Sequence, residues 1–172
     1  RLVHLNSEDI NAYEPILKDD VLLKRVRHII TEQNRTLLFK KALDQHDLFK
    51  LASFLNDSHA SLKHDYEVTG KHLDVLVEAS RKYAIGARMT GAGFGGCAIA
   101  FVEDKREHQM IEHVYNVYQQ TFGFLPSFYT VELSDGVHEC LSVVKIASPA
   151  KKRLLAERVA LISGMRKNHG EP

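Results

Sequence analysis

The hydrophobic periodicity of this sequence changes once, at Gly86, and that change limits the folds open to the chain. Before Gly86, apolar residues recur at helical spacing in three stretches, 20–43, 48–66 and 69–83. After it, CAIAFVE (97–103) is typical of a strand, a helical pattern runs from about 105 to 122, and PSFYTVELSDG (126–136) alternates strictly before an Asp135-Gly136 turn signal. Amphipathic helices that lead into a small sheet predict an α+β domain.

Length and composition exclude several classes of protein. At 172 residues, with 44% hydrophobic and 26% charged residues, the chain suits one globular domain with a real core. It has neither an apolar run long enough for a membrane span nor a secretory signal, so we expect a cytoplasmic protein without a membrane partner. Cys97 and Cys140 lack CxxC spacing, which favours reduced thiols over a disulfide framework or a zinc site.

The formal net charge of +1 divides unevenly along the chain. Residues 150–172 contain six Lys or Arg and two Glu, which gives +4 and leaves −3 for residues 1–149. No basic stripe with interleaved aromatic residues runs through the acidic body, so we expect no nucleic-acid partner.

Four glycines crowd the segment RMTGAGFGGCAIAFV (88–102), in a loop between two expected strands, the first beginning at Gly86. They satisfy G-x-G-x-x-G literally, but a strand rather than a helix follows, which argues against a dinucleotide-binding loop. The next strand also lacks the lysine that a protein-kinase lid requires. From the pattern alone, a tight glycine hairpin and a phosphate-facing loop both stay open.

The segment GARMTGAGFGGCAIAFV (86–102) resembles the third signature motif of the galactokinase branch of the GHMP small-molecule kinases. RVRHIITEQNR (25–35), DSHASLKHDYEVTGKHLDVLV (57–77) and SDGVHE (134–139) resemble the corresponding galactokinase segments in the same order. The resemblance implies that residues 1–140 form a GHMP kinase C-terminal domain, with helices packed on one face of a small, mostly antiparallel sheet. Residues 141–172 are then an atypical basic tail, either helical, with Leu154, Val159 and Ile162 on one side, or disordered.

Galactokinases transfer the γ-phosphoryl group of ATP to the C1 hydroxyl of galactose, with Mg²⁺, in a cleft between two domains. The resemblance places the nucleotide-binding loop, the metal ligands and the catalytic residues in the N-terminal half, which has no counterpart here. We therefore expect no catalytic residue and no metal ligand in this chain. The implied cofactors are ATP and Mg²⁺, and the implied partners are galactose and the missing N-terminal domain.

The resemblance assigns one site element to this chain, a glycine loop beside the phosphate and the sugar. It comprises Thr90, Gly91, Ala92, Gly93, Phe94, Gly95 and Gly96. Backbone without Cβ atoms can come close to a polyanion and present successive N–H groups to it. Arg88, next to the loop, is expected either to neighbour a phosphate or to pair with Asp65 or Glu67.

Other residues carry weaker signals. His59 shares the stripe of Leu55 and Leu62, so we expect a hydrogen-bonded histidine between packed elements rather than a catalytic one. Three functions stay open at this level. The chain is the C-terminal part of a galactokinase that is inactive alone, a non-catalytic galactokinase-like sensor or regulatory module, or the product of a truncated gene.

Overall fold

A computed structural model describes residues 2–5, 7–131 and 157–163 of the chain. Two short 3₁₀ turns, Leu2–His4 and Ser7–Asp9, precede the longer helices. In chain order these are α1 (Ile10–Leu17), α2 (Asp20–Asp44), α3 (Leu48–Ser61), the π-helical turn η3 (Leu62–Tyr66), α4 (Gly70–Arg81) and α5 (Asp104–Phe122).

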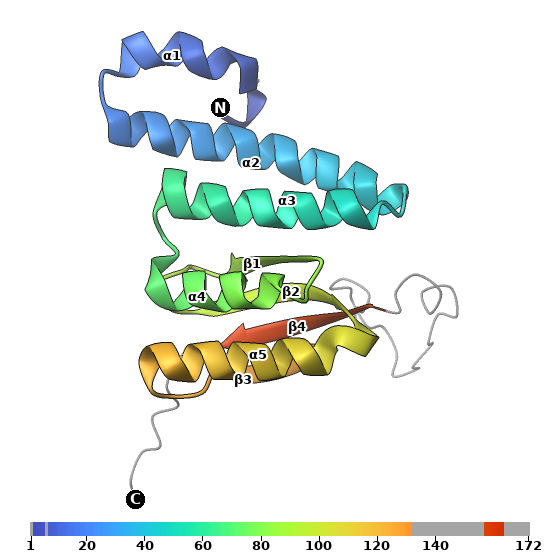
Figure 1. Cartoon of the computed structure of the whole chain (residues 1–172). Coiled ribbons are helices and arrows are strands. Elements are labelled where there is room, and N and C mark those ends of the chain that lie inside the picture. The colour runs from blue at the N-terminus through green and yellow to red at the C-terminus, as the bar shows by residue number, and fades with distance from the viewer. Residues whose placement is uncertain (1, 6, 132–156, 164–172) are drawn as a thin grey trace, which may run out of the picture.

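The described strands form one sheet. They are β1 (Gly86–Thr90), β2 (Cys97–Glu103), β3 (Ser127–Val131) and β4 (Glu157–Ser163). Their order across the sheet is β1-β2-β4-β3, and each neighbouring pair is antiparallel (Figure 1). β4, the last of the described strands in the sequence, therefore lies inside the sheet, between β2 and β3.

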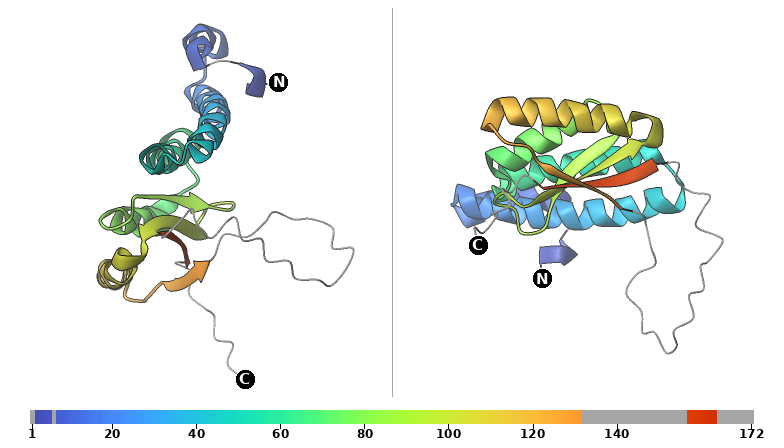
Figure 2. Two further views of the ribbon diagram at one scale, coloured as in Figure 1. Left: turned by 90° about the vertical axis from the view of Figure 1, so that its right-hand side faces the viewer. Right: turned by 90° about the horizontal axis from the view of Figure 1, so that it is seen from below.

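Helices α4 and α5 cover one face of the sheet and enclose the main core there (Figure 2). Leu73 and Leu76 of α4 and Val114 of α5 are fully buried against small strand residues such as Ala87 and Ala100. Small side chains on the strands let the helices pack closely against the sheet. The predicted α+β arrangement, with helices on one face of an antiparallel sheet, is confirmed.

Helix α3 lies along the outer edge of β1 instead of on a face of the sheet. The backbone N–H of Ala87 donates to Asn56 Oδ1 at 3.1 Å, and the N–H of Met89 donates to His59 Nδ1 at 3.2 Å. Both donors point away from β2, so the two helix side chains replace a neighbouring strand. They protect an edge that would otherwise invite pairing with another chain.

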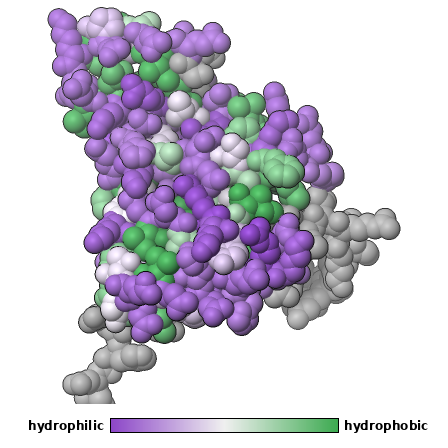
Figure 3. Space-filling model, viewed as in Figure 1, coloured by the Kyte–Doolittle hydropathy of each residue, from purple (hydrophilic) through white to green (hydrophobic). Residues whose placement is uncertain are grey.

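Helices α1 and α2 extend the fold beyond α3 and away from the sheet (Figures 1 and 2). A small second core of Ile10, Leu23 and Ile30 joins α1 to α2. Much of the face seen in Figure 3 is hydrophilic, but large apolar side chains of α2 stay exposed, among them Val21, Leu22 and Leu37. No helix in the described residues is both long enough and apolar enough to cross a membrane.

The expectation of a helix in the basic tail is wrong for residues 157–163, which form β4. Val159 and Ile162 have helical spacing in the sequence, but a short apolar run of this kind fits a strand as well as a helix. Pairing with β2 and β3, which are distant in the sequence, makes residues 157–163 a strand rather than a helix. The expected turn at Asp135-Gly136 and the rest of the tail lie outside the described residues.

The buried His59 predicts that this chain loses stability in mild acid. Its side chain is only 4% exposed, and burial, followed by the charge of Arg81, lowers the pKa of His59 to about 4. The unfolded chain therefore binds more protons between pH values of about 6.5 and 4, so stability is complete above this window and falls as the pH falls through it. We expect a loss of about 3 kcal/mol from this group, measurable by urea unfolding at several pH values.

The matched variant is His59→Asn, whose amide oxygen can accept the Met89 N–H bond without titrating. Subtracting its pH dependence from that of the unmodified chain removes the contribution of carboxylates that titrate in both. An identical pH dependence in the two proteins would show that His59 is not the titrating group.

Candidate functional site

The glycine loop joins β1 to β2 and has a backbone that few residues other than glycine adopt. Gly91, Gly93 and Gly95 have φ values of 82°, 90° and 102°, and Phe94 has a φ of 55°. Thr90 is the last residue of β1 and pairs with Cys97, the first of β2. All seven residues assigned to the loop thus lie in one hairpin end, as the sequence predicts.

One side of the loop is held against the segment that follows the π-helical turn. The N–H of Phe94 donates to the carbonyl oxygen of Val68 at 2.9 Å. A Cβ atom on Gly93 would lie 2.2 Å from that same oxygen, closer than any real contact. Glycine at position 93 is therefore required for the loop to dock on Val68.

The other side of the loop is open. A Cβ atom on Gly91 or on Gly95 would meet no other atom of the chain within 4 Å. Gly91 and Ala92 are exposed, and the side chain of Phe94 is 78% exposed. The loop therefore presents glycine backbone and one aromatic ring outward. On its opposite side, Gly93 lies against the carbonyl of Val68.

The π-helical turn η3 positions both the anchor and a group of charges beside it. Val68 N–H returns to the carbonyl of Leu62, and Glu67 has a left-handed φ of 61°. Glu67 pairs with Arg25 at 2.8 Å and with Lys24 at 3.0 Å. π-helical turns are rare and are frequent at functional sites, and this one turns the chain toward the glycine loop.

Arg88 does not make either ion pair that the sequence suggests. Asp65 accepts from Ser61 at 3.0 Å and pairs with Arg27 at 3.4 Å, whereas Glu67 is taken by the α2 cations. Arg88 Nε donates instead to the carbonyl of Met89 at 2.8 Å, and burial lowers the pKa of its guanidinium.

Arg88 lines a shallow hollow where α2 and α3 meet the sheet. The hollow also includes Glu32 and Arg35 from α2, Phe54 and Ser58 from α3, and Ile99 from β2. Arg35 and Glu32 form an ion pair, and the Ser58 hydroxyl donates to Glu32 at 2.7 Å. Two guanidinium groups and one carboxylate give this hollow a net positive lining, which suits an anion or an acidic surface.

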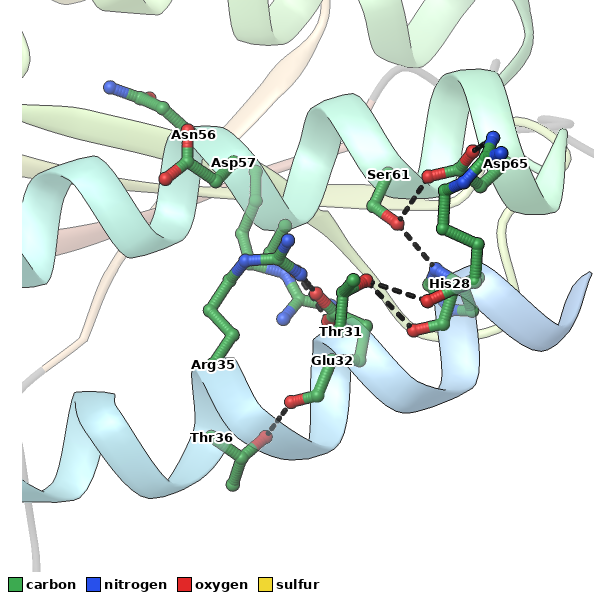
Figure 4. A network of polar contacts seen from close by, with 12 residues as sticks. His28, Thr31, Glu32, Arg35, Thr36, Asn56, Asp57, Ser61 and Asp65 are labelled. Atoms are coloured by element: carbon green, nitrogen blue, oxygen red, sulfur yellow. Dashed lines mark hydrogen bonds and ion pairs between the residues drawn. The ribbon is translucent and has the colours of Figure 1, made fainter. Parts of the chain in front are cut away.

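Polar side chains also fill the contact between α2 and α3 (Figure 4). The Ser61 hydroxyl donates to Asp65, so its oxygen is left to accept from His28 Nδ1–H at 3.0 Å. Burial is the largest cause that lowers the pKa of His28, and its ring stacks on Tyr66. His28 therefore has a structural partner in this interface.

The described residues differ in how well they suit the phosphates of ATP and an Mg²⁺ ion. The open glycine backbone fits the edge of a phosphate site. Within the described ranges, however, no three His, Cys, Asp or Glu side chains gather where they could hold a metal ion.

Comparison with known proteins identifies the class. The family described as GHMP kinases, C terminal, matches residues 39–120, which hold α3, α4, the loop strands and α5. This segment is similar to that family.

Within the family, the chain is similar to galactokinases. It is 46% identical to the Enterococcus faecalis galactokinase over 140 residues, and 45% identical to that of Staphylococcus carnosus over 138 residues. These matches span 80% and 79% of this chain, but only 36% of each relative. A crystal structure of the Lactococcus lactis galactokinase in complex with galactose matches with a TM-score of 0.70 and 45% identity, over 72% of this chain and 32% of that one. The resemblance found in the sequence is confirmed.

The sequence predicted the glycine loop, but it did not predict the contact of the loop with Val68. Nothing in the pattern of residues 62–66 distinguishes a π-helical turn from the end of an α-helix, so the anchor at Val68 was not foreseen. The hollow around Arg35 and Arg88 was also missed, because its residues come from four elements and share no spacing. The run of glycines before a strand was the signal for the loop, and the role of the loop at a site stays a prediction.

The loop geometry predicts different costs for two similar substitutions. Gly93→Ala should destabilise this chain strongly, because the added Cβ would collide with the carbonyl of Val68. Gly95→Ala adds only the strain of a side chain at positive φ, on the order of 1–3 kcal/mol. Urea unfolding of both variants measures the difference.

Gly91→Ala serves as the second reference, because its Cβ also has open space and a positive φ. If Gly93→Ala costs no more than Gly91→Ala and Gly95→Ala, the loop is not docked on Val68.

Proposed function

We propose that this chain acts as the C-terminal part of a galactokinase, an enzyme that phosphorylates galactose at its C1 hydroxyl with ATP and Mg²⁺. The observation that carries the proposal is the loop of residues 90–96, which resembles the third family motif. Its backbone is bonded to Val68 on one side and has open space at Gly91 and Gly95 on the other. Because the chain spans about a third of the length of its relatives, the catalytic residues, the nucleotide site and the metal ligands are assigned to a first part that is not in this sequence.

In this proposal, the loop brings backbone N–H groups to the border of the phosphate and sugar site. Phosphoryl transfer depends mainly on positioning and on stabilisation of charge, so a rigid backbone surface contributes without any reacting side chain. Arg88 lies in β1, two residues before the loop, and its side chain lines the hollow that also holds Arg35. The exposed apolar residues of α2 offer surface for the first part to cover.

A second candidate is a non-catalytic galactokinase-like module. The observation that favours it is β4, since a strand from the tail completes the sheet of this chain. A module of this kind would fold and bind a partner without the first part. Cytoplasmic location stays a prediction for both candidates.

The galactokinase proposal predicts that this chain alone shows no galactose-dependent ATP turnover. Fusing it to the first two-thirds of the Enterococcus faecalis galactokinase should restore turnover, because the missing groups are then supplied. A coupled assay for ADP measures both. A fusion that folds and stays inactive would favour the non-catalytic module, and turnover by the purified chain alone would contradict the assignment of catalysis to the first part.

In an active fusion, Gly95→Val should lower kcat/KM at least about tenfold, which corresponds to about 1.4 kcal/mol. A Cβ atom at position 95 meets no other atom of this chain within 4 Å, so any effect beyond the strain of a positive φ reports on what approaches the loop from outside.

The matched control is Gly123→Val. Gly123 also has a positive φ, 77°, and open space around its Cβ position, but it follows α5 and is not part of the β1–β2 hairpin. Equal kinetics for the two variants would mean that the loop is only a hairpin.

A further inference from the structure

Arg88 carries a charge that no carboxylate of the described residues neutralises. Its Nε–H donates to the carbonyl of Met89 at 2.8 Å, and its two terminal amino groups make no hydrogen bond or ion pair within the described residues. Burial lowers the pKa of the guanidinium, and no carboxylate in the described part of the chain raises it again. A desolvated charge without a partner costs free energy, so the free end of Arg88 favours an anion.

The backbone of β1 directs Arg88 away from the main core. Ala87 and Met89, on either side of it, are buried in the core that α4 and α5 cover. Because side chains alternate along a strand, Arg88 points to the opposite face of the sheet. Its partner across the ladder is Ile99, which lies on that same face and also lines the hollow.

Glu32, the carboxylate that lines the hollow, is held by other groups. It pairs with Arg35, and its Oε2 atom accepts from the Ser58 hydroxyl at 2.7 Å. Burial is the largest cause that lowers the pKa of Arg35, and the charge of Arg88 lowers it further, so the two cations repel each other. Among the residues that line the hollow, one positive charge is therefore in excess, and a single negative charge placed there would attract both guanidinium groups.

Much of the remaining lining is apolar. Phe39 from α2, Phe54 and Leu55 from α3, and Ile99 from β2 supply it. The volume of the hollow is about 270 Å³, below the roughly 300 Å³ at which pockets for drug-sized ligands begin. This size suits a small ligand with an apolar body, which the side chains would remove from water while a guanidinium fixes its charge.

We propose that this hollow is a binding site for a small monocarboxylate, whose carboxylate pairs with Arg88 and whose compact apolar body lies against Phe54 and Ile99. A carboxylate is favoured over a phosphate, because it is planar, matches the fork of a guanidinium and carries the single charge that balances the lining. None of the described lining residues belongs to the loop of residues 90–96, so the proposal does not depend on the proposed galactokinase activity.

The experiment uses the full chain, with benzoate as the probe and methyl NMR as the readout. Benzoate should shift the methyl resonances of Leu55 and Ile99 and saturate the site, because its ring would lie beside them. Benzamide has the same shape without the charge, and acetate has the charge without the ring. At equal ionic strength, both of these and inorganic phosphate should bind at least about tenfold more weakly than benzoate.

Variants of two arginines test the assignment to Arg88. Arg88→Met removes the charge but keeps an unbranched stem, and should weaken benzoate binding at least about tenfold. Arg88→Lys keeps the charge without the planar fork and should have an intermediate affinity. The matched control is Arg106→Met, because Arg106 is an exposed residue of α5 that does not line the hollow, and its binding should be unchanged. Urea unfolding checks that each variant is folded, and the comparison of probes on the unmodified chain needs no variant.

Two results would overturn the carboxylate site. These are equal affinities for benzoate and benzamide in the unmodified chain, and unchanged benzoate binding in a folded Arg88→Met variant.

An acidic side chain of the missing first part has the same chemistry as a free carboxylate, and a second arm separates these sources. In the fusion to the first two-thirds of the Enterococcus faecalis galactokinase, benzoate should still shift the Leu55 and Ile99 resonances, whether or not the fusion is active. A folded fusion that no longer binds benzoate would overturn the assignment to a free ligand, because the first part would then occupy the hollow.

Discussion

The pairing of both edges of β1 is the constraint on which the arrangement of this domain depends. β1 is the outermost strand, and its outward N–H groups are satisfied by Asn56 and His59 of α3. The contact is close enough that a Cβ atom on Gly86 would lie 2.8 Å from the Cα of Ala52. Because α3 is fixed to β1 in this way, the α2–α3 layer and the hollow around Arg88 have defined positions relative to the sheet.

The same constraint extends to the glycine loop. α3 continues into the π-helical turn, the turn places Val68, and the carbonyl of Val68 accepts from Phe94 in the loop. The loop is thus held at its base by the β1–β2 ladder and at its tip by the end of α3. A loop rich in glycine gains a single conformation from two supports rather than from its own sequence.

The elements that the sequence predicted are those whose structure is set by interactions between residues close together in the chain. The helical stripe from Asp20 and the strand at 97–103 both match the structure closely, because hydrophobic periodicity and strand propensity act within a few residues. The π-helical turn at 62–66 and the strand at 157–163 were not predicted, because each depends on partners distant in the sequence. For the candidate site, the glycine motif identified the loop, while its anchor and the neighbouring arginines required the fold.

The predicted loop and the unpredicted strand meet at one residue. Cys97 pairs with Thr90 across the base of the loop and with Ser163 on its other side, so the end of β4 lies one strand away from the first loop residue. A strand held on both sides has less freedom than an edge strand, and the hairpin that ends in it is stiffer as a result. Completion of the sheet by β4 therefore also steadies the backbone of the glycine loop. Through this link, a segment outside the family match influences the element on which the proposed function depends.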